Sequence, residues 1–125
     1  MAELHVEVVA VESEVWSGAA VTVIAKTTEG EIGILPGHAP LLGELAEGST
    51  LRIMQTGGGE VLAAIHGGFL SVTDEGVTVL AEVAELAADI DATRARSALD
   101  RARAEGDDSA VRRAEGRLRA AGSAA

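Results

Sequence analysis

Short apolar runs separated by turn-forming sequences fill the first 82 residues. At the start, Leu4, Val6 and Val8 alternate with His5 and Glu7, which is the period of a strand with one buried face. Further apolar runs cover residues 20–27, 50–56, 60–66, 69–73 and 77–82. The turn sequences lie at residues 28–30, 57–59, 67–68 and 74–76. Because no helical period intervenes, the pattern predicts an antiparallel β-sandwich or flattened barrel of roughly eight to ten strands.

The periodicity becomes helical after Asp89. Apolar residues then recur at helical spacing in two segments, with Ala92, Ala95, Ala98, Leu99 and Ala102 in the first and Val111, Ala114, Leu118 and Ala121 in the second. Asp91 is predicted to cap the first helix, and Asp108 or Ser109 the second, while Gly106 lies where the first helix ends. The pattern therefore predicts an antiparallel two-helix hairpin.

These two patterns divide the chain into a β-sandwich domain at residues 1–85 and an α-helical hairpin at residues 86–125. The fold class is thus mainly β with an added α-helical element. Each predicted helix is near the length at which isolated helices are marginal in water, and the shared seam is mostly alanine. Such a seam buries little apolar surface, which contributes about 25 cal/mol per Å². We expect a hairpin that can detach or rearrange.

The segment from Gly30 to Leu42 interrupts the strand pattern. Pro36 and Pro40 each remove a backbone donor and fix φ, which excludes a central strand there. Glycines in the same segment permit positive φ or close backbone approach. The sequence predicts a rigid, irregular loop that presents Glu31 and His38 for contact with a partner.

Composition narrows the class of protein. Hydrophobic residues make up 47% of the chain and aromatic residues only 2%, so we expect an aliphatic core that includes Trp16 and Phe69. The lack of cysteine excludes disulfides and Cys-based zinc sites and favours an intracellular setting. No run of about 18 apolar residues occurs, which predicts a soluble protein whose membrane contact is indirect.

Charge argues against nucleic acid as a partner. The net charge is −10, with −12 over residues 1–90 and +2 over residues 91–125. The acidic front part repels phosphate backbones, and the later arginines alternate with acids and lack aromatic stacking residues.

The sequence also offers no catalytic constellation. It has no Walker A motif, no nucleophile elbow and no metal-ligand spacing, because His5, His38 and His66 lie in three separate segments. The glycines at 57–59 precede a strand and are predicted to form a hairpin turn, not a phosphate loop. The sequence predicts a protein with no enzymatic activity of its own and no metal site. A small-ligand-binding β-sandwich module is an alternative.

Several motifs occur together in one order. They are Trp16-Ser17-Gly18, the loop at residues 30–42, the segments Gly67-Gly68-Phe69-Leu70-Ser71-Val72 and Val77-Thr78-Val79-Leu80-Ala81, and the hairpin that follows the sheet. In this register the chain resembles the epsilon subunit of the bacterial F-type ATP synthase over essentially its whole length.

The resemblance implies a non-catalytic rotor subunit of the central stalk. It would couple proton translocation to ATP synthesis by linking the gamma subunit to the c-subunit ring, at the cytoplasmic face of the cell membrane. Its hairpin would extend into the alpha/beta catalytic head and inhibit ATP hydrolysis. The implied partner contacts are Glu29, Gly30, Glu31, Gly33, Pro36, Gly37 and His38. Alternatively, Pro36 and Gly37 only form a corner, while His38 caps a backbone carbonyl.

The resemblance also implies a regulatory ATP site, although no cofactor is required. Some members of the family bind ATP through a motif that Ile90-Asp91-Ala92-Thr93-Arg94-Ala95 matches. Arg94 and Arg101 would pair with phosphate oxygens, and Asp91 would hold the base or ribose. The alternative is an ordinary N-cap followed by a solvated arginine.

Inhibition of the head would involve basic residues of the second helix, namely Arg112, Arg113, Arg117 and Arg119. The alternative is a solvated face on which Glu115 and Arg119 form an i,i+4 pair.

Overall fold

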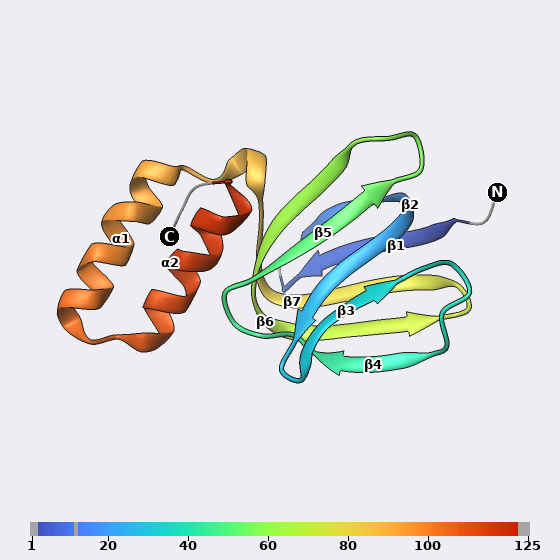
Figure 1. Ribbon diagram of the computed structural model, residues 1–125, viewed down its shortest axis with the longest axis horizontal. Helices are drawn as coiled ribbons and strands as arrows, with labels where there is room; N and C mark the ends of the chain where they lie inside the picture. Colours follow the sequence, from blue (N-terminus) through green and yellow to red (C-terminus); the bar gives the residue numbers. More distant parts are fainter. Residues whose placement is uncertain (1–2, 12, 123–125) are drawn as a thin grey trace.

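Seven strands and two α-helices make up the computed structural model, which describes residues 3–11 and 13–122. The strands are β1 Leu4–Ala10, β2 Ser13–Thr27, β3 Gly30–Ile34, β4 Leu41–Glu44, β5 Ser49–Gln55, β6 Glu60–Thr73 and β7 Gly76–Leu86. A 3-10 turn, η1 Ala87–Asp89, leads to α1 Ala92–Glu105 and α2 Asp108–Ala120. Figure 1 shows the two helices at one end of the sheet, with α2 between α1 and the strands.

β1 closes the sheet because it pairs with two strands. It runs antiparallel to β2 and parallel to β7. The strand order β1-β7-β6-β5-β2 therefore returns to β1, while β3 is added to β2 and β4 to β6. The predicted sandwich or flattened barrel is confirmed, apart from the one parallel pairing.

The described residues contain fewer strands than the eight to ten predicted, because Gly67 and Gly68 do not form a turn. Both have positive φ but lie inside β6, which continues from Glu60 to Thr73. A Cβ on Gly68 would collide with the backbone carbonyl of Leu80 in β7. The two glycines thus bend a long strand and let it approach its neighbour, as closure of a barrel requires.

Aliphatic side chains fill the interior, as the composition predicts. Residues such as Val6, Val8, Ile53 and Leu70 are fully buried in the core that the closed sheet encloses. Trp16 packs against this core and remains partly exposed. The prediction for Phe69 is wrong, because strand alternation directs Leu70 inward and leaves Phe69 51% exposed.

The segment 30–42 is only partly the irregular loop that the sequence predicts. Its first residues form β3, which pairs with β2 alone and so lies at an edge. Leu41 begins β4, another strand that the sequence pattern missed. Residues 35–40 are irregular and contain both prolines, in agreement with the exclusion of a central strand.

The helical hairpin forms with the predicted caps at its first helix. Asp91 caps α1 by accepting a hydrogen bond from the Arg94 amide, and Gly106 ends α1 in the left-handed region with a φ of 69°. The cap of α2 is Asp107, which precedes both predicted candidates, Asp108 and Ser109, because the turn after Gly106 is shorter than expected. Ala95, Leu99, Ala114 and Leu118 form the seam between the helices. None of the helices in the described residues is long and apolar enough to cross a membrane.

Candidate functional site

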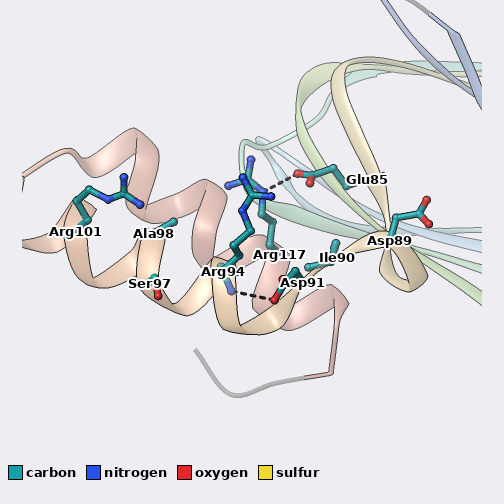
Figure 2. A pocket seen from close by; sticks show the side chains of 10 residues that line it. Glu85, Asp89, Ile90, Asp91, Arg94, Ser97, Ala98, Arg101 and Arg117 are labelled. Carbon is teal, nitrogen blue, oxygen red and sulfur yellow. Dashed lines mark hydrogen bonds and ion pairs between the residues drawn. The ribbon is translucent and has the colours of Figure 1, made fainter.

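A pocket of about 450 Å³ lies where the end of β7 meets the hairpin. Figure 2 shows that side chains from the end of β7, from residues 89–91 and from both helices line it. The lining residues are Glu85, Asp89, Ile90, Asp91, Arg94, Ala95, Ser97, Ala98, Arg101 and Arg117. Its volume is within the usual range for pockets that bind small molecules.

All five residues predicted to bind nucleotide, namely Ile90, Asp91, Arg94, Ala95 and Arg101, line this pocket. Helical spacing accounts for part of the arrangement, because Arg94, Ala98 and Arg101 lie on one face of α1. The N-cap role of Asp91 occupies only Oδ1, which accepts a hydrogen bond of 3.1 Å from the Arg94 amide. The backbone thus brings the predicted residues to one cavity, and their part in ATP binding stays a prediction.

Glu85 and Arg117 are pocket residues that the sequence analysis did not include in the site. Arg117 Nε donates a 2.6 Å hydrogen bond to Glu85 Oε1, which joins α2 to β7 (Figure 2). Burial alone would raise the pKa of Glu85, but the hydrogen bond and charge of Arg117, together with His66, hold it below its usual value. No local motif marks Glu85, because its partners come from distant segments.

The pocket contains both signs of charge. Three arginines, Arg94, Arg101 and Arg117, supply planar donors suited to phosphate oxygens. Within the described ranges, no ion pair involves the side chain of Arg94 or Arg101. Carboxylates of Glu85, Asp89 and Asp91 line the same cavity and would repel phosphate. Such a mixture suits a ligand with an anionic end and a hydroxylated or amine-bearing end.

None of the residues predicted for the partner loop lines this pocket. Glu29, Gly30, Glu31, Gly33 and Gly37 are exposed, whereas Pro36 and His38 are partly buried. Nδ1 of His38 lies 2.7 Å from the carbonyl oxygen of Ala39, so the ring donates to it. In the chain by itself, His38 thus caps a backbone carbonyl, as the alternative interpretation predicted.

A row of apolar side chains on the outer face of the sheet was not predicted. Phe69 of β6 pairs with Leu80 of β7, and both are about half exposed, at 51% and 52%. Leu42 of β4 is 72% exposed and lies diagonally next to Phe69, because its register partner is Ser71. We call Leu42, Phe69 and Leu80 the outer apolar row. Adjacent exposed apolar side chains of this kind mark a candidate contact surface for a partner.

No group of three or more potential metal ligands occurs among the described residues. In particular, His5 contacts Glu7 and His66 contacts Glu85, so the fold pairs each with a carboxylate of its own.

The chain is similar to known proteins of one family. Residues 3–87 match the model of the ATP synthase delta/epsilon chain β-sandwich domain. The chain is 56% identical over 119 residues to the ATP synthase epsilon chain of Streptomyces avermitilis, covering 95% of each chain. The chain belongs to the ATP synthase epsilon chain family. The epsilon chain of Rhodococcus erythropolis is also similar, with 55% identity over 120 residues that cover 96% of this chain and 97% of that one.

The fold of this epsilon chain also resembles chains in solved ATP synthase structures. A chain of the Euglena gracilis mitochondrial ATP synthase, in an assembly of OSCP, F1 and c-ring, matches 94% of this chain and 76% of its own length, with a TM-score of 0.76 and 27% identity. A chain from the central stalk and c-ring of the Tetrahymena thermophila enzyme shares the fold, with a TM-score of 0.56 and 19% identity over 88% of this chain and 92% of that one.

Proposed function

We propose that this epsilon chain family member is a non-catalytic rotor subunit that links the gamma subunit to the c-subunit ring in the central stalk. The observation that carries the proposal is full-length similarity to epsilon chains, which covers the sandwich and the hairpin together. Through this linkage the chain helps couple proton translocation to ATP synthesis. It associates with the cytoplasmic face of the cell membrane only through the c ring.

Two exposed surfaces of the sandwich support separate contacts. Glu29 and Glu31 are exposed on the turn and edge strand that form a hairpin with β2, which suits contact with the c ring. The outer apolar row suits the gamma subunit, because burial of half-exposed Phe69 and Leu80 gives a stable contact. Two distinct surfaces would allow one small domain to transmit torque between two partners.

The hairpin is proposed to regulate ATP hydrolysis by leaving the sandwich and entering the alpha/beta catalytic head. Its contacts with the sandwich are chiefly polar, including the Glu85–Arg117 hydrogen bond and the Glu47–Arg112 ion pair. Polar contacts of this kind can be exchanged for water or for acidic partner residues at small net cost. Arg112, Arg113, Arg117 and Arg119 would then become available to the head.

ATP is proposed to bind the pocket between β7 and the hairpin and to favour the docked state. Because the pocket combines residues of the sandwich with residues of both helices, it exists only while the hairpin is docked. A ligand that binds only one conformation shifts the population towards it. NMR titration of the full chain tests this proposal, and unchanged signals of Asp91 and Arg94 in millimolar ATP would contradict it.

Reconstitution with the other subunits tests the rotor function. We expect the full chain to co-purify with the gamma subunit and the catalytic head. A chain truncated after Glu85 should still assemble but should raise ATP hydrolysis. A full chain that stays monomeric in the presence of gamma would refute the rotor function, whereas assembly with unchanged hydrolysis would refute only the inhibitory role.

A further inference from the structure

The surface that α2 covers on the sandwich includes buried polar groups. Helix α2 packs on β5 and β6, and strand alternation places Ile65 in the core and its neighbours Ala64 and His66 on the face towards α2. Thr50 of β5 pairs with Ala64 and lies on the same face. Its buried Oγ1 has no hydrogen-bond partner in the described part of the chain. The hairpin therefore covers polar groups that water would satisfy.

The side of α2 that faces the sheet is equally poor in large apolar residues. Gly116 and Ala120 are buried but do not belong to the seam with α1. Polar contacts hold the ends of the helix. Ser109 donates to Glu47 at 2.6 Å, and Arg119 donates to the carbonyl oxygen of Gly48 at 2.8 Å. Docking thus depends on hydrogen bonds and close backbone approach.

His66 belongs to this interface and is only 3% exposed. Its Nε2 lies 3.1 Å from Oε1 of Glu85, the same oxygen that accepts from Arg117. Its Nδ1 has no hydrogen-bond partner within residues 3–11 and 13–122. The neutral ring that carries its proton on Nε2 fits this arrangement, because it donates to Glu85 and leaves only a lone pair unsatisfied.

We propose that His66 is a proton-sensitive release point, at which protonation of the imidazole favours detachment of the hairpin from the sandwich. Protonation would add an N–H group at Nδ1 with no acceptor and would place a cation beside Arg113 and Arg117 of α2. Detachment removes both arginines and hydrates the ring. The consequence for ATP hydrolysis rests on the proposed regulatory function, but the release itself does not.

The charges around His66 set the direction of the pH dependence. Burial is the main cause that lowers its pKa below 6.5, the charges of Arg117 and Arg113 add to this, and Glu85 opposes it. The third packed element, β5, contributes the neutral Thr50. In the detached state the exposed ring regains its ordinary pKa. Docking is therefore strongest above pH 6.5 and weakens as the pH falls below that value.

Carboxylates act in a separate, lower pH window. The pKa values of Glu47 and Glu85 lie below their usual 4.5 in the docked state. Their contribution to docking is complete above pH 4.5 and is lost only below it. A transition between pH 7.5 and pH 5.5 would thus report on His66 alone among these groups.

A distance measurement on the full chain tests the proposal. The sequence has no cysteine, so Lys26→Cys and Ala104→Cys accept one pair of spin labels. Both positions are exposed, and Lys26 accepts a backbone hydrogen bond from Ala46, next to the docking residue Glu47. We expect one short distance at pH 7.5 and a growing longer population by pH 5.5. The docking equilibrium should change about tenfold for each pH unit by which the pKa of His66 differs between the two states.

Two variants separate His66 from the other histidines. His66→Gln keeps a donor for Glu85 but does not titrate, so its distance distribution should not change between pH 7.5 and pH 5.5. His5→Gln removes an exposed histidine and should respond like the parent chain. An unaltered pH response in His66→Gln, or a parent chain that stays docked at pH 5.5, would overturn the proposal.

NMR of the unsubstituted chain provides a second test, which does not depend on whether a variant folds. The imidazole of His66 should titrate below its ordinary pKa of 6.5, together with amide signals at the contacts of α2. Titration of His66 without changes in α2 would also overturn the proposal. Release without any effect on hydrolysis in the assembled enzyme would instead refute the regulatory function and leave the release mechanism intact.

Discussion

Gly116 of α2 lies directly against the backbone of Gly48, in the connection between β4 and β5. A Cβ built on Gly116 would lie 2.5 Å from the carbonyl oxygen of Gly48, a distance that real Cβ atoms do not adopt. Gly48 itself has a φ of 71°, and a Cβ there would collide with the carbonyl oxygen of Arg112. The two glycines allow the helix and the sandwich to meet backbone against backbone.

Substitution of Gly116 should therefore undock the hairpin while it strengthens the helix. Gly116→Ala raises helix propensity by about 1 kcal/mol, but overpacking at the contact costs about 1–3 kcal/mol. We expect the spin-label pair at Lys26→Cys and Ala104→Cys to report more detached hairpin, with helical circular dichroism maintained. Thr93→Ala, at an exposed position of α1, is the control and should remain docked. A docked Gly116→Ala chain would show that the contact tolerates a methyl group.

Glu47 should contribute a salt-sensitive part of docking. Its Oε1 accepts a hydrogen bond from the Ser109 hydroxyl and lies 3.4 Å from Arg112 Nε, and its Oε2 lies 3.8 Å from a terminal guanidinium nitrogen of Arg113. The Ser109 hydrogen bond and both arginine charges lower its pKa. Because the group is partly exposed, Glu47→Gln should weaken docking by no more than about 1 kcal/mol. The spin-label distances of the parent chain should depend on salt concentration more strongly than those of the variant; equal salt dependence would show that Glu47 contributes nothing.

Phe69 should matter for partner binding and not for folding. Its side chain is 51% exposed on the outer apolar row, so Phe69→Glu should lower the free energy of unfolding by less than about 1 kcal/mol. Loss of a buried aromatic contact should weaken gamma binding at least about tenfold, as measured by calorimetry. Thr73→Glu, an exposed position on the same strand, is the matched control. Gamma affinity equal to that of the parent chain would place the gamma contact elsewhere.

Local sequence patterns predicted the strands and helices of this fold better than the contacts between them. Strand alternation and the change to helical spacing near Asp89 predicted the sandwich, the hairpin and the N-cap at Asp91 because each depends on neighbouring residues. Glycine signals were ambiguous. Gly106 ends a helix as predicted, but Gly67 and Gly68 bend a strand, since the same conformational freedom serves a turn or a close approach.

Contacts between distant segments were not visible in the sequence. The motif around Asp91 indicated one wall of the pocket, yet Glu85 and Arg117 complete it only because α2 folds back against β7. His66 reads as an isolated histidine within an apolar run, and its partners lie 19 and more residues away. Phe69 was assigned to the wrong face because composition favours burial of aromatic residues, while strand register decides which face they occupy.

The two roles of Asp91 can be separated by two substitutions. Asp91→Ala removes the N-cap of α1 and should lower helix stability by about 1 kcal/mol, whereas Asp91→Asn keeps a comparable cap. If the carboxylate also contacts the base or ribose of ATP, both variants should bind ATP more weakly than the parent chain. Thermal unfolding measures the first effect and an ATP titration the second. Normal ATP affinity in Asp91→Asn would reduce Asp91 to a helix cap.

Arg101 and Arg117 should respond differently to loss of charge, although both line the pocket. No ion pair involves Arg101 in the described residues, so Arg101→Gln should leave docking unchanged without ATP and lower ATP affinity about tenfold or more. Arg117→Gln breaks the hydrogen bond to Glu85 and should weaken docking even without ATP. Arg103→Gln removes a charge from α1 outside the pocket and is the control for both, since its 3.9 Å ion pair with Glu115 lies within the hairpin and does not involve the sandwich. Spin-label distances with and without ATP measure docking, and titration measures affinity. Equal ATP affinity in Arg101→Gln and Arg103→Gln would mean that Arg101 does not hold phosphate.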